Sequence, residues 1–402
     1  MWHSKSVDLP DQGRILAREY WDYYSSEYPW NDEGRFPIDR RFTEDSFSRI
    51  GFSDAQVRDL IHSGYIVVGN LVVDRYYGGL LLSSDLRSRV RLNQFVEEPI
   101  YRQHPANVHH ASSVSDIKDC IQKWQETSSR KLLFRGQICS YSVKRAWPNP
   151  AYAVAEFGEI SLIPTLWRKM LGAGNIGREN FRNLSTFEWS KILYSDFDLA
   201  EVERHQREAI DRGEWIYTAQ DMEDSDDPLL RDFGRRRLDV MVGLDYDLSV
   251  QSQTLLQHYG LLSPLLDLSS DLNIALFFAT HRLSKLHNSN RYTYEYVGTN
   301  NRQSVLYVIR ENSDEMEAHW HHRALETIKP QRPMRQSCVV AYGGMDALNL
   351  PLEFLFGVIA LDFDELDSSK YVIESLFPNA QQDPFLAALL ENLLFPQHVT
   401  TF

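Results

Sequence analysis

Short, almost uninterrupted apolar runs restrict this chain to folds with a buried β-sheet. Residues 132–134 (LLF), 261–268 (LLSPLLDL) and 358–361 (VIAL) are such runs, and each is followed directly by a charged or hydroxyl side chain. A strand that is covered on both faces is apolar along its length, whereas a strand with one solvated face alternates. We therefore expect these runs to be buried strands of a sheet.

Amphipathic helices separate these runs. Residues 113–128 repeat apolar side chains at helical spacing, and so do residues 272–283, for which Ser269 or Ser270 is the expected N-cap. A last helix is expected to begin directly after Asp383, with a proline at its first position. Helices between buried strands predict an α+β fold.

Size and composition limit the function. The chain has 402 residues, of which 43% are hydrophobic, and a formal net charge of -14. This length suits two or three domains. The acidic charge argues against a protein that coats nucleic acid, so nucleic acid is expected only as a locally bound substrate. No apolar run approaches the roughly 18 residues of a membrane span, and the first residues lack a signal-peptide pattern. We expect a cytoplasmic protein without a membrane partner.

The residue types that most often bind metals are scattered. Cys120, Cys139 and Cys338 are too few and too far apart for a disulfide framework or a zinc site, and we interpret them as reduced thiols in or near the core. His109 and His110 have no partner at ligand spacing, so we interpret them as loop residues. The sequence therefore predicts no metal site.

Residues 1–110 are expected to form a small accessory region, and residues 111–402 the main domain. Residues 11–28 have helical spacing, Ser53 is a suitable N-cap, and residues 65–73 are typical of two strands joined by a turn. The accessory region is rich in Tyr and Trp, which favours an interface with a partner such as an antitoxin or another regulatory protein. Packing of these aromatics on the main domain explains them equally well.

Two charged segments lie in the middle of the chain. Residues 221–228 (DMEDSDDP) are interpreted as a solvated loop. Arg235, Arg236 and Arg237 are secondary candidates for phosphate contacts, although one exposed helix face also explains them.

Arg135 is the first candidate for a binding residue, because it follows a buried strand and precedes Gly136. The simplest explanation is a surface arginine at a strand end. The alternative is an anion clamp, because a guanidinium matches phosphate and a glycine lets a ligand approach the backbone. In that case we expect Arg135 to face a cleft near the helix start at residues 269–271, where free N–H groups favour an anion. A simple role as helix caps explains the serines there equally well.

Residues 257–260 (QHYG) are expected to end a helix, with Gly260 just past its last turn. His258 is a candidate acid–base group, because the ordinary pKa of a histidine lies near neutrality. A structural role beside Tyr259 explains this histidine equally well.

Six motifs, in order along residues 113–345, resemble the FRG domain, a family named for its Phe-Arg-Gly signature. One departure is Ser263-Pro264-Leu265, where family members usually have Pro-Thr-Arg. The motifs are FRGQ at 134–137, the Leu-x-Pro-x-x-x-Arg element at 162–168, QHYG at 257–260, LLD at 265–267, ALFFA at 275–279 and RPMRQ at 332–336.

The resemblance implies a fold like that of ADP-ribosyltransferases: a mixed, split β-sheet with helical insertions, to which the small N-terminal region is added. NAD would then be the substrate, lying across the split sheet without a metal. The family context implies a toxin or phage-defence effector, of the kind found in toxin–antitoxin systems, that modifies a macromolecule, either nucleic acid or protein. On this mapping Arg135 is the clamp, and the cofactor-binding residues are Gly136, Gln137, Tyr259, Asp267, Ser269, Ser270 and Phe278.

Gln336 stands at the third catalytic position, where the resemblance leads us to expect a glutamate. An amide cannot supply the negative charge that stabilises a ribosyl cation, although it can position an acceptor. Either another acid such as Glu353 or Glu326 supplies the charge, or the domain is a nucleotide-sensing or partner-binding module without turnover. We favour the enzyme.

Overall fold

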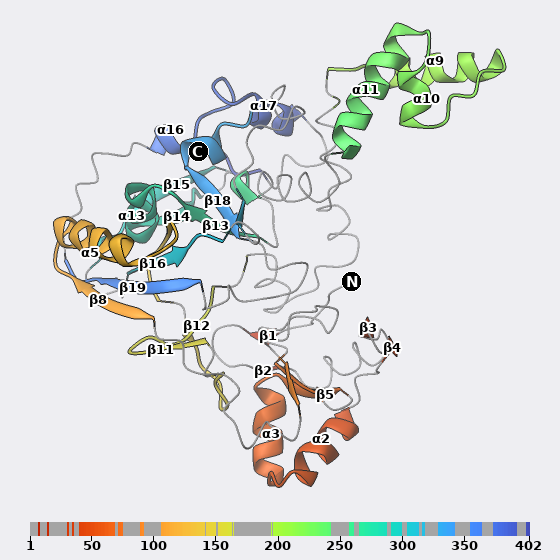
Figure 1. Cartoon of the computed structure of the whole chain (residues 1–402). Helices are drawn as coiled ribbons and strands as arrows, with labels where there is room; N and C mark the ends of the chain where they lie inside the picture. The colour runs from red at the N-terminus through yellow and green to blue at the C-terminus, as the bar shows by residue number, and fades with distance from the viewer. Residues whose placement is uncertain are drawn as a thin grey trace.

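The computed structural model shows an α+β protein built around one mixed sheet (Figure 1), which confirms the expected fold class. The residues that the structure describes are 7–8, 14–15, 30–31, 34–35, 40–68, 71–74, 89–91, 106–140, 142–149, 152–162, 164, 194, 196–242, 257–260, 265–287, 291–299, 304–312, 316–317, 329–341, 354–363, 373–391 and 399–402.

Seven strands form the central sheet, in the order β17-β18-β13-β9-β16-β19-β8. Neighbouring strands are antiparallel, except for the parallel pair β19 and β8. All seven residues of β19 are buried, as its apolar sequence predicts. The strands are β8 (Asn107–Ala111), β9 (Leu132–Gln137), β13 (Leu266–Ser269), β16 (Val305–Arg310), β17 (Met316–Glu317), β18 (Cys338–Ala341) and β19 (Leu355–Leu361).

Two helices, α5 (Val114–Thr127) and α13 (Leu272–Thr280), contribute to one apolar core cluster with the sheet. Ile117 from α5 and Ala275 from α13 are buried in this cluster together with Leu306 of β16. The Ser113 hydroxyl caps α5 by accepting a hydrogen bond from the third N–H of the helix. This core fixes the position of β9, which carries Arg135.

The sheet has a weak joint between β9 and β13. Strands β9 and β16 are paired over six residues, from Gln137 to Leu132, whereas β9 and β13 are paired only at Ser269 and Phe134. Helix α13 packs so closely on β9 that a Cβ atom at Gly136 would lie 1.7 Å from the carbonyl oxygen of Ala275. The sheet therefore consists of a four-stranded half, β9-β16-β19-β8, and a three-stranded half, β17-β18-β13.

The N-terminal region contains a helical pair and a small sheet. Ser53 caps the second helix, as expected, and forms a capping box with Gln56; residues 65–68 pair with residues 71–74 as the two expected strands. The elements are α2 (Arg40–Arg49), α3 (Asp54–His62), β5 (Tyr65–Val68), β6 (Leu71–Asp74) and β7 (Arg89–Arg91).

The long helix predicted for residues 11–28 is wrong where it can be checked. Arg14–Ile15 form a short strand, β2, paired with β1 (Val7–Asp8), so that backbone pairing replaces helical hydrogen bonds there. The rest of that segment lies outside the described residues. A second short pair consists of β3 (Trp30–Asn31) and β4 (Gly34–Arg35).

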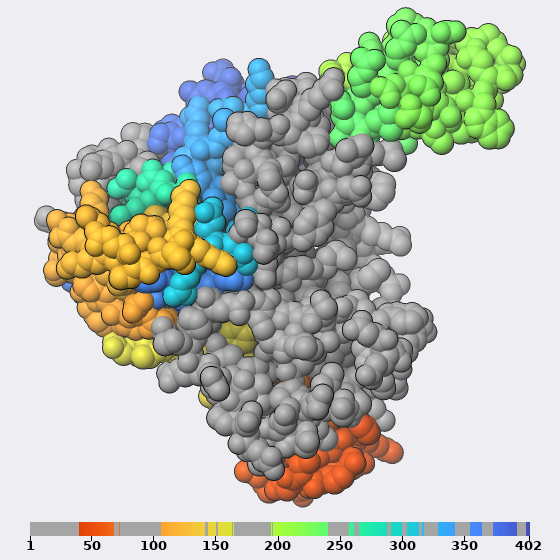
Figure 2. All heavy atoms as spheres, viewed as in Figure 1, coloured from red at the N-terminus to blue at the C-terminus, as the bar shows by residue number. Residues whose placement is uncertain are grey.

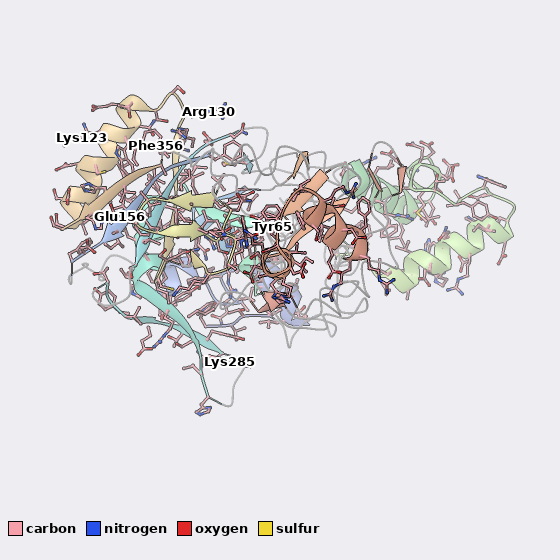
Figure 3. The ribbon with its side chains drawn as sticks, turned by 90° about the horizontal axis from the view of Figure 1, so that it is seen from below. Tyr65, Lys123, Arg130, Glu156, Lys285 and Phe356 are labelled. Atoms are coloured by element: carbon pink, nitrogen blue, oxygen red, sulfur yellow. The ribbon has the colours of Figure 1, made fainter. Side chains whose placement is uncertain are left out.

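A buried ion pair connects the N-terminal region to the main domain. Arg145 contacts Glu159 at 2.6 Å and donates a hydrogen bond to the carbonyl oxygen of Ser63, also at 2.6 Å. The guanidinium lies over the ring of Tyr65, which is labelled where the two parts meet in Figure 3. The supporting three-stranded sheet consists of β10 (Ser142–Val143), β11 (Ala153–Val154) and β12 (Gly158–Ile160).

Three helices, α9 (Leu199–Asp211), α10 (Ala219–Glu223) and α11 (Pro228–Val242), project from the rest of the molecule with their own apolar cluster (Figures 1 and 2). The interpretation of residues 221–228 as a solvated loop is therefore wrong at both ends: residues 221–223 belong to α10 and Pro228 begins α11, and only residues 224–227 form a loop. Asp221 forms a capping box at the start of α10, and the Asp227 carboxylate accepts hydrogen bonds from N–H groups at the start of α11. Carboxylates at helix N-termini satisfy these donors.

Helix α13 ends earlier than the sequence predicts. It stops at Thr280, and the chain continues as β14 (His281–Lys285), which pairs with β15 (Tyr292–Tyr296). Leu283, expected on the buried face of the helix, is 45% exposed on the hairpin. The remaining helices are α15 (Arg332–Arg335), α16 (Ile373–Leu376) and α17 (Pro384–Glu391). Among the described helices, none combines the length and the apolar character needed to cross a membrane.

Candidate functional site

A pocket of about 200 Å³ opens at the joint between β9 and β13. Its walls come from β9, β13, β18, α13 and the turn at residues 257–260, so it draws on both halves of the sheet. The lining residues are Phe134, Arg135, Gly136, Gln257, His258, Asp267, Leu268, Ser269, Ala275, Phe278, Gln336 and Cys338.

Arg135 connects the two halves at this joint. Its Nη1 donates a hydrogen bond of 2.5 Å to the backbone carbonyl oxygen of Asp267, on the other side of the joint. The guanidinium therefore lies in the pocket that Ser269 also lines, and it is not a solvated surface arginine. A short, charge-assisted hydrogen bond of this kind holds the group in one orientation.

The structure requires a glycine at position 136 for a different reason from the one expected. The carbonyl of Ala275 occupies the space that a Cβ atom would need, so the glycine allows a helix to approach β9. Although Gly136 also lines the pocket, helix packing alone requires a glycine at this position.

Three titratable side chains meet in the pocket. His258 Nε2 lies 3.9 Å from Asp267 Oδ1, and the Cys338 thiol lies 3.8 Å from the same oxygen. Burial lowers the pKa of His258, against the attraction of Asp267. Burial raises the pKa of Asp267, against its attraction to His258, when that ring is protonated, and to Arg135. Burial and the adjacent carboxylate also raise the pKa of the Cys338 thiol well above its usual range. At neutral pH the imidazole is uncharged and Cys338 is a thiol.

Gln336 directly follows α15 and lines the pocket. Its Nε2 donates a hydrogen bond of 3.1 Å to the carbonyl of Leu376, and its own backbone carbonyl accepts one of 3.0 Å from the Ser269 hydroxyl. These bonds attach Gln336 to β13 and to the C-terminal region. The amide thus has a fixed position at the pocket, as a positioning group requires.

The start of α13 is capped by Asp271, and the expectation of Ser269 or Ser270 as N-cap is wrong. The Asp271 carboxylate accepts the N–H of Asn273 at 2.8 Å. Ser269 instead hydrogen bonds to Gln336, and the Ser270 hydroxyl donates to the carbonyl of Ser337. Since a carboxylate already occupies this helix end, it is a poor place for a second anion.

Some predicted site residues lie elsewhere. Tyr259 is fully buried and donates a 2.5 Å hydrogen bond to Asp383, while burial and that carboxylate raise its pKa well above the ordinary value. Gln137, Tyr259 and Ser270 are absent from the lining of this pocket. Glu353 and Glu326 lie outside the described residues. Gly260 has φ of 95°, which a glycine adopts without strain, as its expected position past a turn requires.

Among the lining residues with a polar side chain or a thiol, two were missed as site residues, Gln257 and Cys338. Gln257 stands in the QHYG motif, so the motif could have identified it. Its amide stabilises the charged form of Asp267. Cys338 follows the RPMRQ motif by two residues, but only the pairing of β18 with β13 places it opposite Ser269.

The remaining candidates have structural partners. His109 and His110 lie in β8 and not in a loop; His109 contacts Asp116 at 3.0 Å, and His110 contacts Glu156 and Asp362. Of the arginine cluster on α11, Arg235 pairs with Glu223 and Arg236 with Asp196. Arg235 is exposed, as the helix-face interpretation expects, whereas Arg236 and Arg237 are half-buried.

Comparison with known families supports the family assignment made from the motifs. Residues 180–288 match the family model of the FRG domain, which confirms the family that the sequence predicts. The match contains the QHYG, LLD and ALFFA motifs, whereas the motifs at 134–137, 162–168 and 332–336 lie outside it. No curated protein and no solved structure matches the chain.

Proposed function

We propose, from the premise that this chain carries an FRG domain, that the pocket at the sheet joint binds NAD and that the protein transfers ADP-ribose to a macromolecule. The observation that supports this most strongly is the joint itself. Two strands that share one residue pair diverge around a pocket, and Arg135 reaches from one strand to the other there. A split sheet with an arginine on its first strand is what the resemblance to ADP-ribosyltransferases implies.

The pocket suits one end of a dinucleotide. Its volume of about 200 Å³ is below the roughly 300–1,000 Å³ of pockets that enclose a drug-sized ligand. We therefore assign it to the nicotinamide ring and the adjoining ribose, with Phe278 as the aromatic contact. The Arg135 guanidinium then binds a phosphate or ribose oxygen at the pocket edge, because its fork of donors matches such groups.

The transfer step breaks the bond between nicotinamide and C1′ of the ribose. Nicotinamide leaves as a neutral molecule with the bonding electron pair, and positive charge develops on the ribose. A nucleophilic atom of the target then bonds to C1′ and loses its proton to solvent. In this proposal Gln336 positions the ribose or the target, and Glu353 or Glu326 supplies the carboxylate that stabilises the cation.

A labelled-NAD assay with RNA, DNA and protein substrates tests the proposal. Arg135→Ala should abolish both NAD binding and labelling, because the clamp acts in the ground state and in the transition state. Gln336→Ala should lower turnover more than binding. Loss of roughly 100-fold or more in Glu353→Gln or Glu326→Gln would identify the stabilising acid.

Arg282→Ala is the matched control, because this exposed arginine on the β14–β15 hairpin pairs with Glu295 at 3.2 Å and does not line the pocket. It should leave binding and labelling unchanged. If wild-type protein consumes no NAD with any substrate but binds a nucleotide in a manner that needs Arg135, the chain is a nucleotide-sensing module.

The same proposal includes a role as a toxin or defence effector. Expression of the wild-type chain in bacterial cells should then arrest growth or block phage, and Arg135→Ala should relieve this effect. A regulatory partner is expected to bind residues 1–110, and coexpression of the full chain with a candidate partner would test for it. The expected boundary at residue 110 lies within β8 of the central sheet, so the full chain is the appropriate bait. Unimpaired growth and phage replication with active wild-type protein would reject the toxin assignment.

A further inference from the structure

Three potential metal ligands from three separate segments meet at the pocket. They are His258 in the turn before β13, Asp267 in β13 and Cys338 in β18. Their ligand atoms all lie within 4.8 Å of one another, and two of the distances are 3.9 Å (Nε2 to Oδ1) and 3.8 Å (Sγ to Oδ1). We propose that these three side chains bind a divalent transition metal ion, for which zinc is the best fit.

The donor set suits zinc. Zinc binds imidazole nitrogen, thiolate sulfur and carboxylate oxygen, and its ligand distances of about 2.0–2.3 Å place the donor atoms of a tetrahedral site about 3.3–3.7 Å apart. The distances of 3.8 and 3.9 Å are close to this range, and the third pair, His258 and Cys338, lies within 4.8 Å, so the side chains must move inward to bind the ion. A mixed N, O, S set disfavours magnesium and calcium, which prefer oxygen alone.

A second observation concerns the histidine. The His258 side chain is 2% exposed, and its Nε2 has no hydrogen-bond partner among the residues that the structure describes. At 3.9 Å from Asp267 Oδ1, the nitrogen is too far for a hydrogen bond but lies on the side of the other two ligands. A buried polar atom without a partner is unfavourable, and a metal ion would bind this lone pair.

The surroundings provide outer contacts and access. The Gln257 amide interacts with Asp267, as partners of metal ligands commonly do. The Asp267 side chain is 28% exposed, which gives an ion a path from the pocket. Two cations face the site, Arg135 and Arg332, but a carboxylate and a thiolate together balance the charge of a divalent ion.

Three protein ligands leave one coordination position for a water molecule or a ligand oxygen, as in catalytic zinc sites. The site shares the pocket proposed for NAD but does not depend on that proposal. It does exclude His258 as an acid–base group, because a metal-bound imidazole nitrogen cannot accept a proton.

Metal binding to the full chain tests the proposal directly. Chelator-treated wild-type protein should bind one Co²⁺ or Zn²⁺ ion per chain, and the Co²⁺ form should show a sulfur-to-cobalt charge-transfer band. X-ray absorption of the zinc form should find one sulfur among nitrogen and oxygen neighbours. Both measurements use wild-type protein, so they do not depend on the folding of a variant. Binding no stronger than that of an unrelated protein, or a zinc shell without sulfur, would overturn the proposal.

Variants identify the ligands. Cys338→Ser should lose the charge-transfer band and most of the affinity, whereas Cys120→Ser should keep both. Cys120 is the matched control, because it is also a buried thiol but lies on α5 and packs in the apolar core. Equal metal binding by both variants would contradict the assignment.

The metal site and the NAD site can fail separately. Arg135→Ala should lose NAD binding and keep the metal ion. Wild-type protein that uses NAD but binds no metal would reject the metal site alone, and a metal-binding protein without nucleotide affinity would reject the proposed function alone.

Discussion

The two halves of the central sheet differ in what their side chains do. In the four-stranded half, β16 carries five consecutive buried apolar residues, Val305 to Ile309, and is paired along its length with both neighbours. In the three-stranded half, β13 and β18 carry Asp267, Ser269 and Cys338 at a pocket. One half is an apolar core, whereas the other places polar and titratable groups beside an opening.

The difference shows where the chain gives up stability. Continuous pairing and apolar burial stabilise a sheet, and both are interrupted where β9 meets β13. Natural proteins depart from such rules mainly at functional sites. The joint is thus the region in which substitutions should separate stability from binding, and four substitutions test this from the largest expected effect to the smallest.

Gly136→Ala should have the largest effect. The new Cβ would lie 1.7 Å from the Ala275 carbonyl oxygen and 2.8 Å from the Ala279 nitrogen, so α13 would have to move away from β9. We expect a loss of about 4 kcal/mol or more in the free energy of unfolding, measured by denaturant titration. A loss below about 1 kcal/mol would show that α13 does not hold the joint as described.

Leu306→Ala should follow. Leu306 is fully buried between the strands and helices of the apolar half, so its truncation leaves a cavity. We expect a loss of about 2–5 kcal/mol in the free energy of unfolding, with NAD affinity unchanged in the folded fraction. A comparable loss of NAD affinity would break the division between the two halves.

Asp267→Asn, in contrast to Leu306→Ala, should leave the free energy of unfolding almost unchanged. Burial disfavours the charged carboxylate, and an amide of the same shape removes that desolvation cost. In chelator-treated protein we expect the free energy of unfolding to change by less than about 1 kcal/mol, in either direction. Destabilisation on the scale of Leu306→Ala would make Asp267 a structural residue.

Substitution of His110, at the outer edge of the apolar half, should have the smallest effect on the free energy of unfolding. Hydrogen bonds with Glu156 and then Asp362, on opposite ring nitrogens, raise its pKa above 6.5. The stabilisation is therefore complete below the unfolded pKa and is lost as the pH rises through the folded pKa. Because about half of the imidazole is exposed, we expect at most about 1 kcal/mol.

The measurement is the difference in unfolding free energy between wild type and His110→Gln, at about pH 6 and about pH 9. The difference should be larger at the lower pH. An equal difference at both values would mean that the two carboxylates do not act on this histidine.

Local sequence signals predicted much of the fold. Ser53 caps a helix as expected, residues 114–127 form the expected helix, and the apolar runs form strands of the central sheet. Predictions failed where neighbours outside the local segment decide the structure. Leu283 has helical spacing but lies in a hairpin because β14 pairs with β15, and Arg14 lies in a strand because β1 pairs with it.

The candidate site was predicted through the family resemblance and not from local spacing. The resemblance assigned Arg135, Asp267 and Gln336 to one site, and all three line the pocket, but spacing alone does not reveal the strand order that brings them together. Cys338 shows this most clearly, because a cysteine without nearby partners in sequence lies opposite Ser269 only through the pairing of β18 with β13.

Amide hydrogen exchange with and without saturating NAD tests the central claim, that the joint is the ligand site, most directly. NAD should slow exchange in peptides that cover residues 132–137, 265–269 and 338–341. Exchange in residues 199–242, which form the projecting helices, should not change. Slowed exchange confined to the projecting helices or the N-terminal region, or no NAD binding at all, would contradict the account.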